Sequence, residues 1–198
     1  MPWLAIFLAT LMVFNSSLLG QDKSKDKAKD KAKDEQKVET TNAEAYEFYL
    51  KGFHKYKKRE NTEDAIIAQE LVSKAIELDD QLVKAKAFLA LTYTTMGDND
   101  TTIDILEPAL RQAQKIGDRE GEAAILGAFG QAYCTKGNLE LDIFYHKKAV
   151  EICNEIGNAS GSMSNLSSLG YAYKNTGDLD KALGYLESSL EIAEELDA

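Results

Sequence analysis

The apolar residues beyond residue 42 recur at the spacing of α-helices. The first stretch carries Tyr46, Tyr49, Leu50 and Phe53 at positions i, i+3, i+4 and i+7, which is the stripe of an amphipathic helix. Short polar turns containing glycine separate this stretch from several similar ones. Proline, which would interrupt helices, occurs only twice in the 198 residues. The pattern therefore predicts an all-α chain built from long helices.

The turns repeat at a fixed interval. Gly97, Gly137 and Gly177 are spaced 40 residues apart, and each follows an apolar residue, a small residue and then a tyrosine at matching positions. The small residues are Ala90, Gly130 and Gly170, and we expect them to lie where the two helices of a pair cross. A less regular unit precedes these three. The chain therefore divides into four predicted helix pairs, at about 42–80, 81–120, 121–160 and 161–198.

This constellation resembles the tetratricopeptide repeat (TPR), in which the small residue allows close helix approach and the tyrosine fills the space beside it. The 40-residue units are similar to the long repeats of adaptor and bacterial signalling TPR proteins. The resemblance covers residues 42–198 and implies a right-handed α-solenoid of four TPR helix pairs. It also implies a non-catalytic scaffold or adaptor that binds a protein or peptide on its concave surface, with no cofactor.

The first 41 residues have a different composition. Residues 3–14 form an apolar run that has the length of a signal-peptide core, so we predict a signal peptide at 1–20 and an exported protein, periplasmic or extracellular. The alternative is an uncleaved membrane anchor. Residues 21–41 alternate Lys and Asp in a nearly four-residue repeat, which predicts a charged, disordered linker.

Charge argues against a nucleic-acid partner. The formal charge of the chain is −10, and the residues beyond 40 carry 16 basic and 27 acidic side chains. Such a surface repels phosphate backbones.

Catalytic and metal sites have weak support in the sequence. Asp142 and His146 at i, i+4 could form a general base with its orienting carboxylate, but no motif places a nucleophile beside them, and we predict a structural pair. Asp98 is predicted to cap a helix rather than to bind calcium. Helix geometry keeps Cys134 and Cys153 too far apart for a disulfide, which predicts free thiols.

The predicted binding surface follows the first helix of each pair, where residues between the core positions face the groove. The residues assigned to partner binding are Leu91, Thr95, Gln131, Thr135, Ser168, Tyr171, Lys174 and Asn175.

A second predicted surface is the terminal apolar edge of the last helix, which consists of Leu183, Leu186 and Leu190. Their counterparts in interior repeats should be covered by the following repeat, so we expect this edge to be covered by a second copy in a weak homodimer, by a further segment or by a partner.

Two rival hypotheses remain open at this stage. The chain ends at a repeat boundary, which favours a sensory or docking region of a larger signalling protein, kinase-linked or cyclase-linked. The other rival is an enzyme centred on Asp142 and His146, which requires that this pair open to a pocket.

Overall fold

The fold is described by a computed structural model of residues 42–197, which contain eight helices and no strand. The predicted signal peptide at 1–20 and linker at 21–41 lie outside the described residues. The first helix covers residues 42–57. The others are α2 (Thr62–Leu78), α3 (Val83–Thr95), α4 (Asn99–Ile116), α5 (Arg119–Thr135), α6 (Leu139–Glu155), α7 (Ala159–Thr176) and α8 (Leu179–Asp197).

Local sequence signals set the ends of these helices. An Asn or Asp side chain precedes each helix from α4 to α8 and accepts a hydrogen bond from a backbone N–H in the first turn, as Asn138 does from Leu141. These bonds satisfy donors that have no partner within the helix. The glycines of the repeating turns have positive φ values, 85° at Gly97 and 84° at Gly177, and residues that carry a side chain rarely adopt such values. The ends of the helices are therefore encoded locally.

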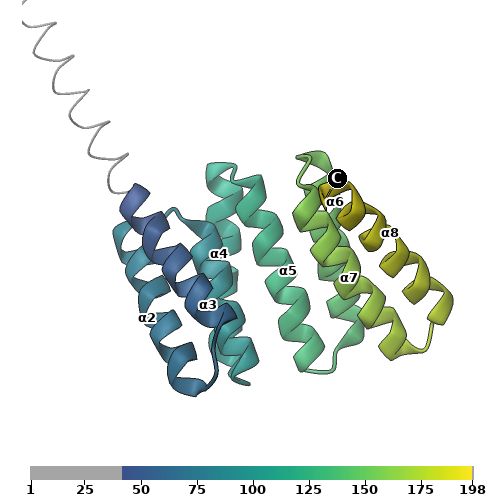
Figure 1. Ribbon diagram of the computed structural model, residues 1–198, viewed down its shortest axis with the longest axis horizontal. Coiled ribbons are helices and arrows are strands. Elements are labelled where there is room, and N and C mark those ends of the chain that lie inside the picture. The colour runs from purple at the N-terminus through teal and green to yellow at the C-terminus, as the bar shows by residue number, and fades with distance from the viewer. Residues whose placement is uncertain (1–41, 198) are drawn as a thin grey trace, which may run out of the picture. The chain divides into compact units, whose positions relative to one another are not determined.

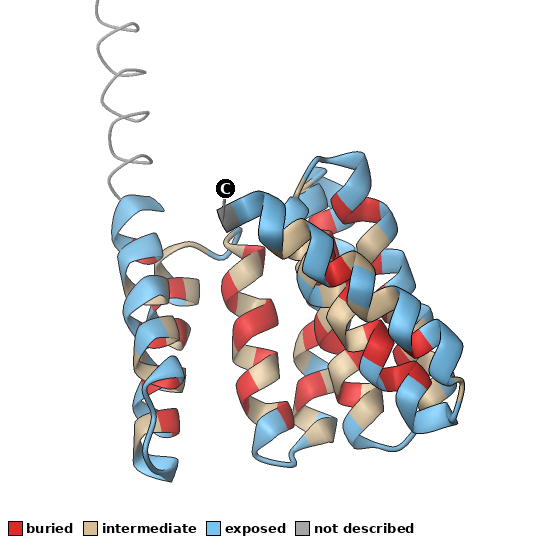
Figure 2. Cartoon of the chain, turned by 45° about the vertical axis from the view of Figure 1, so that its right-hand side comes forward, coloured by how far each residue is buried: buried red, intermediate tan, exposed pale blue. Residues whose placement is uncertain are grey.

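Consecutive helices pair and the pairs stack in sequence order (Figure 1). Within residues 44–197, α3 contacts α4, α5 contacts α6 and α7 contacts α8, while α4 packs on α5 and α6 on α7. The first helices of neighbouring pairs also touch, α3 with α5 and α5 with α7. Buried residues lie on the helix faces that meet a neighbour, and exposed residues lie on the outside (Figure 2). This arrangement confirms the predicted all-α solenoid of four helix pairs.

Glycine permits the close crossing within a pair. A Cβ atom placed on Gly170 would lie 2.6 Å from Cγ of Leu186 and 3.2 Å from the carbonyl oxygen of Ala182, both in α8. Gly52 has the same environment in the first pair, 2.5 Å from Val72 and 2.9 Å from the carbonyl oxygen of Ala68. Gly52 is therefore the structural counterpart of Gly170, and the predicted crossing point is confirmed.

The second helix of the last pair, α8, is less covered by neighbouring helices than α4 and α6, the second helices of the interior pairs. On α4, Ile103 and Leu110 pack against a buried cluster that includes Phe129 of α5, and on α6, Ile143 and Val150 pack against Leu169 and Tyr173 of α7. The side chains at the same positions of α8, Leu183 and Leu190, are 58% and 59% exposed. Leu186, which the sequence assigned to the same edge, is half-buried against Gly170 and so faces inward. Within residues 42–197, no helix has the length and apolar character that crossing a bilayer requires.

Candidate functional site

The first helices of the pairs create a groove. It has a volume of about 520 Å³ and runs across α3, α5 and α7, with Tyr49 of the first helix at one side and His146 of α6 in its lining. Small side chains form its middle, where α5 lies between its two neighbours. These residues are Ala87, Ala123, Ala124, Gly127 and Ala128. The groove exists because small residues at these positions leave space that larger side chains would fill.

Polar groups are placed at the two sides of this apolar floor. Lys84 of α3 and Glu120 of α5 form an ion pair at 2.5 Å. On α7, Ser164, Asn165 and Ser168 present two hydroxyl groups and one amide to the same hollow. The groove thus combines a narrow floor without bulky side chains and a rim that can exchange hydrogen bonds, which suits an extended polypeptide.

The predicted partner-binding residues fall into two sets. Leu91, Gln131 and Ser168 line the groove. Thr135 lies outside its lining, where its hydroxyl donates to the side-chain oxygen of Asn99 at 2.8 Å. The remaining α7 residues are on the exposed surface beyond the lining, and they are Tyr171, Lys174 and Asn175. For all of them, a role in binding remains a prediction.

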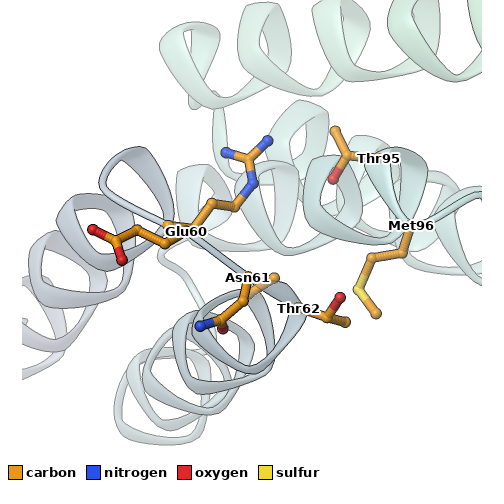
Figure 3. Close-up of a pocket in the computed structure, with 7 residues that line it drawn as sticks. Glu60, Asn61, Thr62, Thr95 and Met96 are labelled. Carbon is orange, nitrogen blue, oxygen red and sulfur yellow. The ribbon is translucent and has the colours of Figure 1, made fainter.

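Thr95 lies in a different, smaller hollow at the turns of the first two pairs (Figure 3). This hollow has a volume of about 480 Å³ and is formed by the start of α2, the end of α3 and the turn that contains Arg59. Thr95 bonds to the hydroxyl of Tyr56, and the Arg59 guanidinium donates to the Tyr56 carbonyl at 2.9 Å. Because the Thr95 hydroxyl and the Arg59 guanidinium already have partners within the chain, the turn hollow is a weaker candidate than the groove.

A buried polar cluster connects the groove to the interior of the third pair. The Nδ1 atom of His146 is 2.9 Å from Oδ1 of Asn165, and its Nε2 atom is 3.4 Å from Oδ1 of Asp142. His146 and Asp142 are 4% and 1% exposed. Two glycines of α5 provide the room, since a Cβ on Gly130 would lie 2.6 Å from the imidazole and one on Gly127 would lie 2.8 Å from Oδ1 of Asn165.

The hydrogen-bond pattern assigns the protons in this cluster. The amide nitrogen of Asn165 donates to the Gly161 carbonyl at 2.8 Å, so its oxygen faces His146 and must accept from Nδ1–H. The Nε2 atom is then left as an acceptor that faces Asp142. Burial raises the pKa of the Asp142 carboxyl, although His146 opposes this, and burial lowers the pKa of His146. Burial therefore favours the uncharged form of both groups.

The geometry supports the structural interpretation of the pair over the catalytic one. Both side chains are almost fully buried. His146 reaches the lining of the groove, as the catalytic alternative requires, but Asp142 does not, and neither carboxylate oxygen of Asp142 has a well-aligned hydrogen-bond partner among the described residues. The neighbouring thiol belongs to Cys134, and burial, together with the charge of Asp142, raises its pKa to about 11. A thiol with that pKa is protonated near neutral pH and is a poor nucleophile.

The other predicted candidates have structural roles. Asp98 caps α4 by accepting from the backbone N–H of Thr101 at 3.1 Å, as the sequence predicted. Cys134 and Cys153 are both free thiols. Within residues 42–197, no group of three or more His, Cys, Asp or Glu side chains is arranged to hold a metal ion.

The sequence interpretation missed Asn165. The residues at its position in the two preceding pairs are Ala85 and Ile125, which are fully buried. An amide at a repeat position that is otherwise apolar was therefore a signal that could have been used. The comparison of the repeats could not reveal that the partner of this amide, His146, comes from the preceding pair.

Comparison with known proteins agrees with this architecture. Family models described as the tetratricopeptide repeat match residues 81–155 and 166–197. No curated protein matches the chain in sequence.

Two solved structures are similar in fold. Aspartyl phosphate phosphatase F from Bacillus subtilis aligns with a TM-score of 0.64 and 15% identity over 79% of this chain and 42% of that protein. BtubC (BKLC) from P. vanneervenii aligns with a TM-score of 0.56 and 16% identity over 68% of this chain and 58% of that protein. This chain thus spans less than two thirds of either protein, and at these identities the likeness concerns the fold alone.

Proposed function

We propose, on the premise that this chain belongs to the tetratricopeptide repeat family, that it is a non-catalytic scaffold that holds an extended segment of a partner protein in the groove of α3, α5 and α7. The observation that carries the proposal is the groove itself, about 520 Å³ in volume, with its floor of small side chains. An extended peptide needs such a narrow channel because its backbone must approach the helices closely.

The chemistry of the lining indicates what the segment should contain. The floor formed by Ala124, Gly127 and Ala128 accommodates small or flat side chains. The amide of Gln131 can bond to peptide groups in either direction because it carries both a donor and an acceptor, whereas the amide of Asn165 is already bonded to Gly161 and His146. The Lys84–Glu120 pair neutralises the charge at one side. These features favour an uncharged segment that is recognised mainly through its backbone.

A matched pair of substitutions on α7 tests the proposal. Ser168 lines the groove and Tyr171, one turn later, lies outside its lining. Partners captured by the full chain from a lysate of the host would be identified by mass spectrometry. Their affinities would then be measured with purified proteins by titration calorimetry.

Ser168→Arg should abolish the binding of the true partner because the guanidinium occupies the channel, whereas Tyr171→Arg, beyond the lining, should weaken it much less. If every captured partner binds both variants like the parent, or loses both equally, the groove is not the binding site.

The proposal also covers the location of the protein and its place in a longer chain. We propose that the protein is exported, because residues 3–14 have the composition of a signal-peptide core. Amino-terminal sequencing of the mature protein should then start at Gln21, whereas a start at Met1 in a membrane fraction supports the anchored alternative. The same binding activity could also serve within a longer signalling protein, which sequencing of the coding region downstream of Ala198 would decide.

A further inference from the structure

We propose that α8 of one molecule binds the first helix (residues 44–57) of a second copy, so that the chains associate head to tail and continue the solenoid. This contact is independent of the groove. It starts from the exposed face of α8, where Leu183 and Leu190 stand at positions that α5 and α7 cover in the interior pairs.

The two ends of the solenoid carry opposite charge. Residues 44–59 contain five basic and two acidic side chains, whereas α8 contains one basic and six acidic ones. The acidic residues of α8 gather in its second half, and its last turn has no basic residue. Because the carboxyl end of a helix is already the negative end of its dipole, this clustering favours a basic partner. Two copies joined α8 to α8 would instead oppose two acidic faces.

The interior junctions show which residues would meet. Gly52 and Gly130 occupy the same helix-crossing position in their helix pairs. Lys58 and Lys136 each lie six residues after these glycines, so the two lysines are counterparts. Lys136, which directly follows α5, forms an ion pair at 3.3 Å with Asp100 at the start of α4. The residue of α8 that corresponds to Asp100 is Asp180, two periods later. Head-to-tail stacking therefore brings Lys58 of one copy to Asp180 of the next.

The junction between α6 and α7 indicates a second pair of residues that would meet between two copies. The ammonium group of Lys147 lies 5.5 Å from the ring centroid of Tyr173. The corresponding residues at the two ends are Glu187 on α8 and Lys55 on the first helix, whose ammonium group already forms an ion pair with Asp64 of α2, so Glu187 shares this cation with Asp64. An aromatic contact in the interior is thus replaced by a pair of opposite charges at the ends.

The apolar part of the contact uses lysine stems. Lys51 stands at the position of Phe129 and Leu169, which cover the preceding second helix in the interior junctions. Its hydrocarbon chain can lie over Leu183 and Leu190 while its ammonium group stays in water. The first helix exposes Tyr46 and Leu50, but at the position that faces α8 it carries the polar-headed Lys51, so the apolar area of this contact comes mainly from the leucines of α8.

One pair of residues that head-to-tail stacking brings together is repulsive, and this repulsion limits the strength of the contact between copies. In the interior, Gln114 of α4 donates to Glu122 of α5 at 3.0 Å. The corresponding residues at the ends are Glu194 and Glu44, which repel each other. The contact is heterologous, so repetition of it yields open chains of molecules rather than a closed dimer.

Sedimentation velocity on the full chain at several concentrations tests the proposal. The parent should show an average mass that rises with concentration and falls with added salt, because the charged pairs are screened. Leu183→Glu/Leu190→Glu blocks the tail and Lys51→Glu/Lys58→Glu blocks the head, and each variant should be monomeric alone. An equimolar mixture of the two should form a one-to-one dimer and nothing larger, because it retains one competent junction.

Charge exchange provides the matched control for specific pairing. Lys58→Asp should weaken association by roughly threefold to tenfold, and adding Asp180→Lys to the same chain should restore it. Glu44→Lys should strengthen association because it removes the repulsion with Glu194. Circular dichroism confirms that each variant is folded.

The proposal is overturned by a parent that stays monomeric at every concentration. It is also overturned if the head-blocked variant still dimerises by itself, which would indicate a symmetric α8 contact, or if the mixture of blocked variants does not associate.

Discussion

The buried pair of Asp142 and His146 permits a prediction in which two related variants change stability in opposite directions. The last helix pair carries Ala182 and Leu186 at the same positions, and Leu186 packs there against Gly170 as His146 packs against Gly130. Replacing the polar pair by its apolar counterparts therefore uses side chains whose fit this fold already demonstrates.

The double variant Asp142→Ala/His146→Leu should be more stable than the parent. It removes a carboxyl group that is 1% exposed and whose oxygens lack well-aligned partners in the described residues. Such a group costs about 1–3 kcal/mol. The lost bond to Asn165 costs less, because this amide lines the groove and can bind water. The expected gain is about 1–2 kcal/mol, or a rise in Tm of roughly 2–8 °C.

The single variant His146→Leu should do the reverse. It removes the imidazole that faces Asp142 at 3.4 Å and leaves the buried carboxyl group beside an apolar side chain, which costs about 1–3 kcal/mol. The free energy of unfolding, measured by urea titration of the full chain, should rank the double variant first, the parent second and the single variant last. If the double variant is less stable than the parent, the pair contributes net stability and this reasoning is wrong.

The pH dependence gives an independent check. In His146→Leu the pKa of Asp142 is raised by burial above its ordinary value of 3.8. The contribution of Asp142 to stability should then be full below pH 3.8 and decline as the pH rises through the folded-state pKa. In the parent, the lowered pKa of His146 adds the opposite trend, since its contribution is present above pH 6.5 and is lost as the pH falls through the lower folded-state pKa. The double variant should lack both trends.

Three further predictions address the repeats and the linker. Gly170→Leu should cost about 1–3 kcal/mol because a side chain there meets α8 at 2.6 Å, whereas Lys174→Ala on the exposed surface should leave Tm unchanged in thermal melts. Asn138→Ala should cost about 1 kcal/mol in urea titration because the cap of α6 is lost, and an unchanged midpoint would show that the cap is not needed. Deletion of residues 21–41, a charged and nearly apolar-free segment, should leave Tm within a few degrees of the parent, and a larger drop would show that the segment docks on the helices.

Much of the fold could be predicted because its signals are local and periodic. Gly97, Gly137 and Gly177 marked the turns through a backbone conformation that other residues disfavour. Ala90, Gly130 and Gly170 marked the helix crossings because only small residues permit that separation. Such constraints act within one helix pair, so the spacing of single residues reveals them.

The candidate site could be predicted only in part. Leu91, Gln131 and Ser168 were placed in the groove correctly because helical periodicity determines which face a residue occupies. Thr95 was placed on the same face, yet its hydroxyl is bonded to Tyr56 beside another hollow. Periodicity predicts which face of the helix a side chain occupies. It does not predict where along the groove the side chain lies or which other groups of the chain bond with it.

The sequence by itself thus determined the helices, their boundaries, the number of pairs and the acidic character of the folded region. The tertiary structure alone decided that Asn165 of one pair would meet His146 of another, that Asp142 would be buried, and that Leu186 would turn inward while Leu183 and Leu190 remained exposed. The physical reason is that burial and hydrogen bonding between pairs depend on how consecutive repeats stack. Stacking sums many weak contacts over all facing residues, whereas a cap or a turn depends on a few adjacent ones.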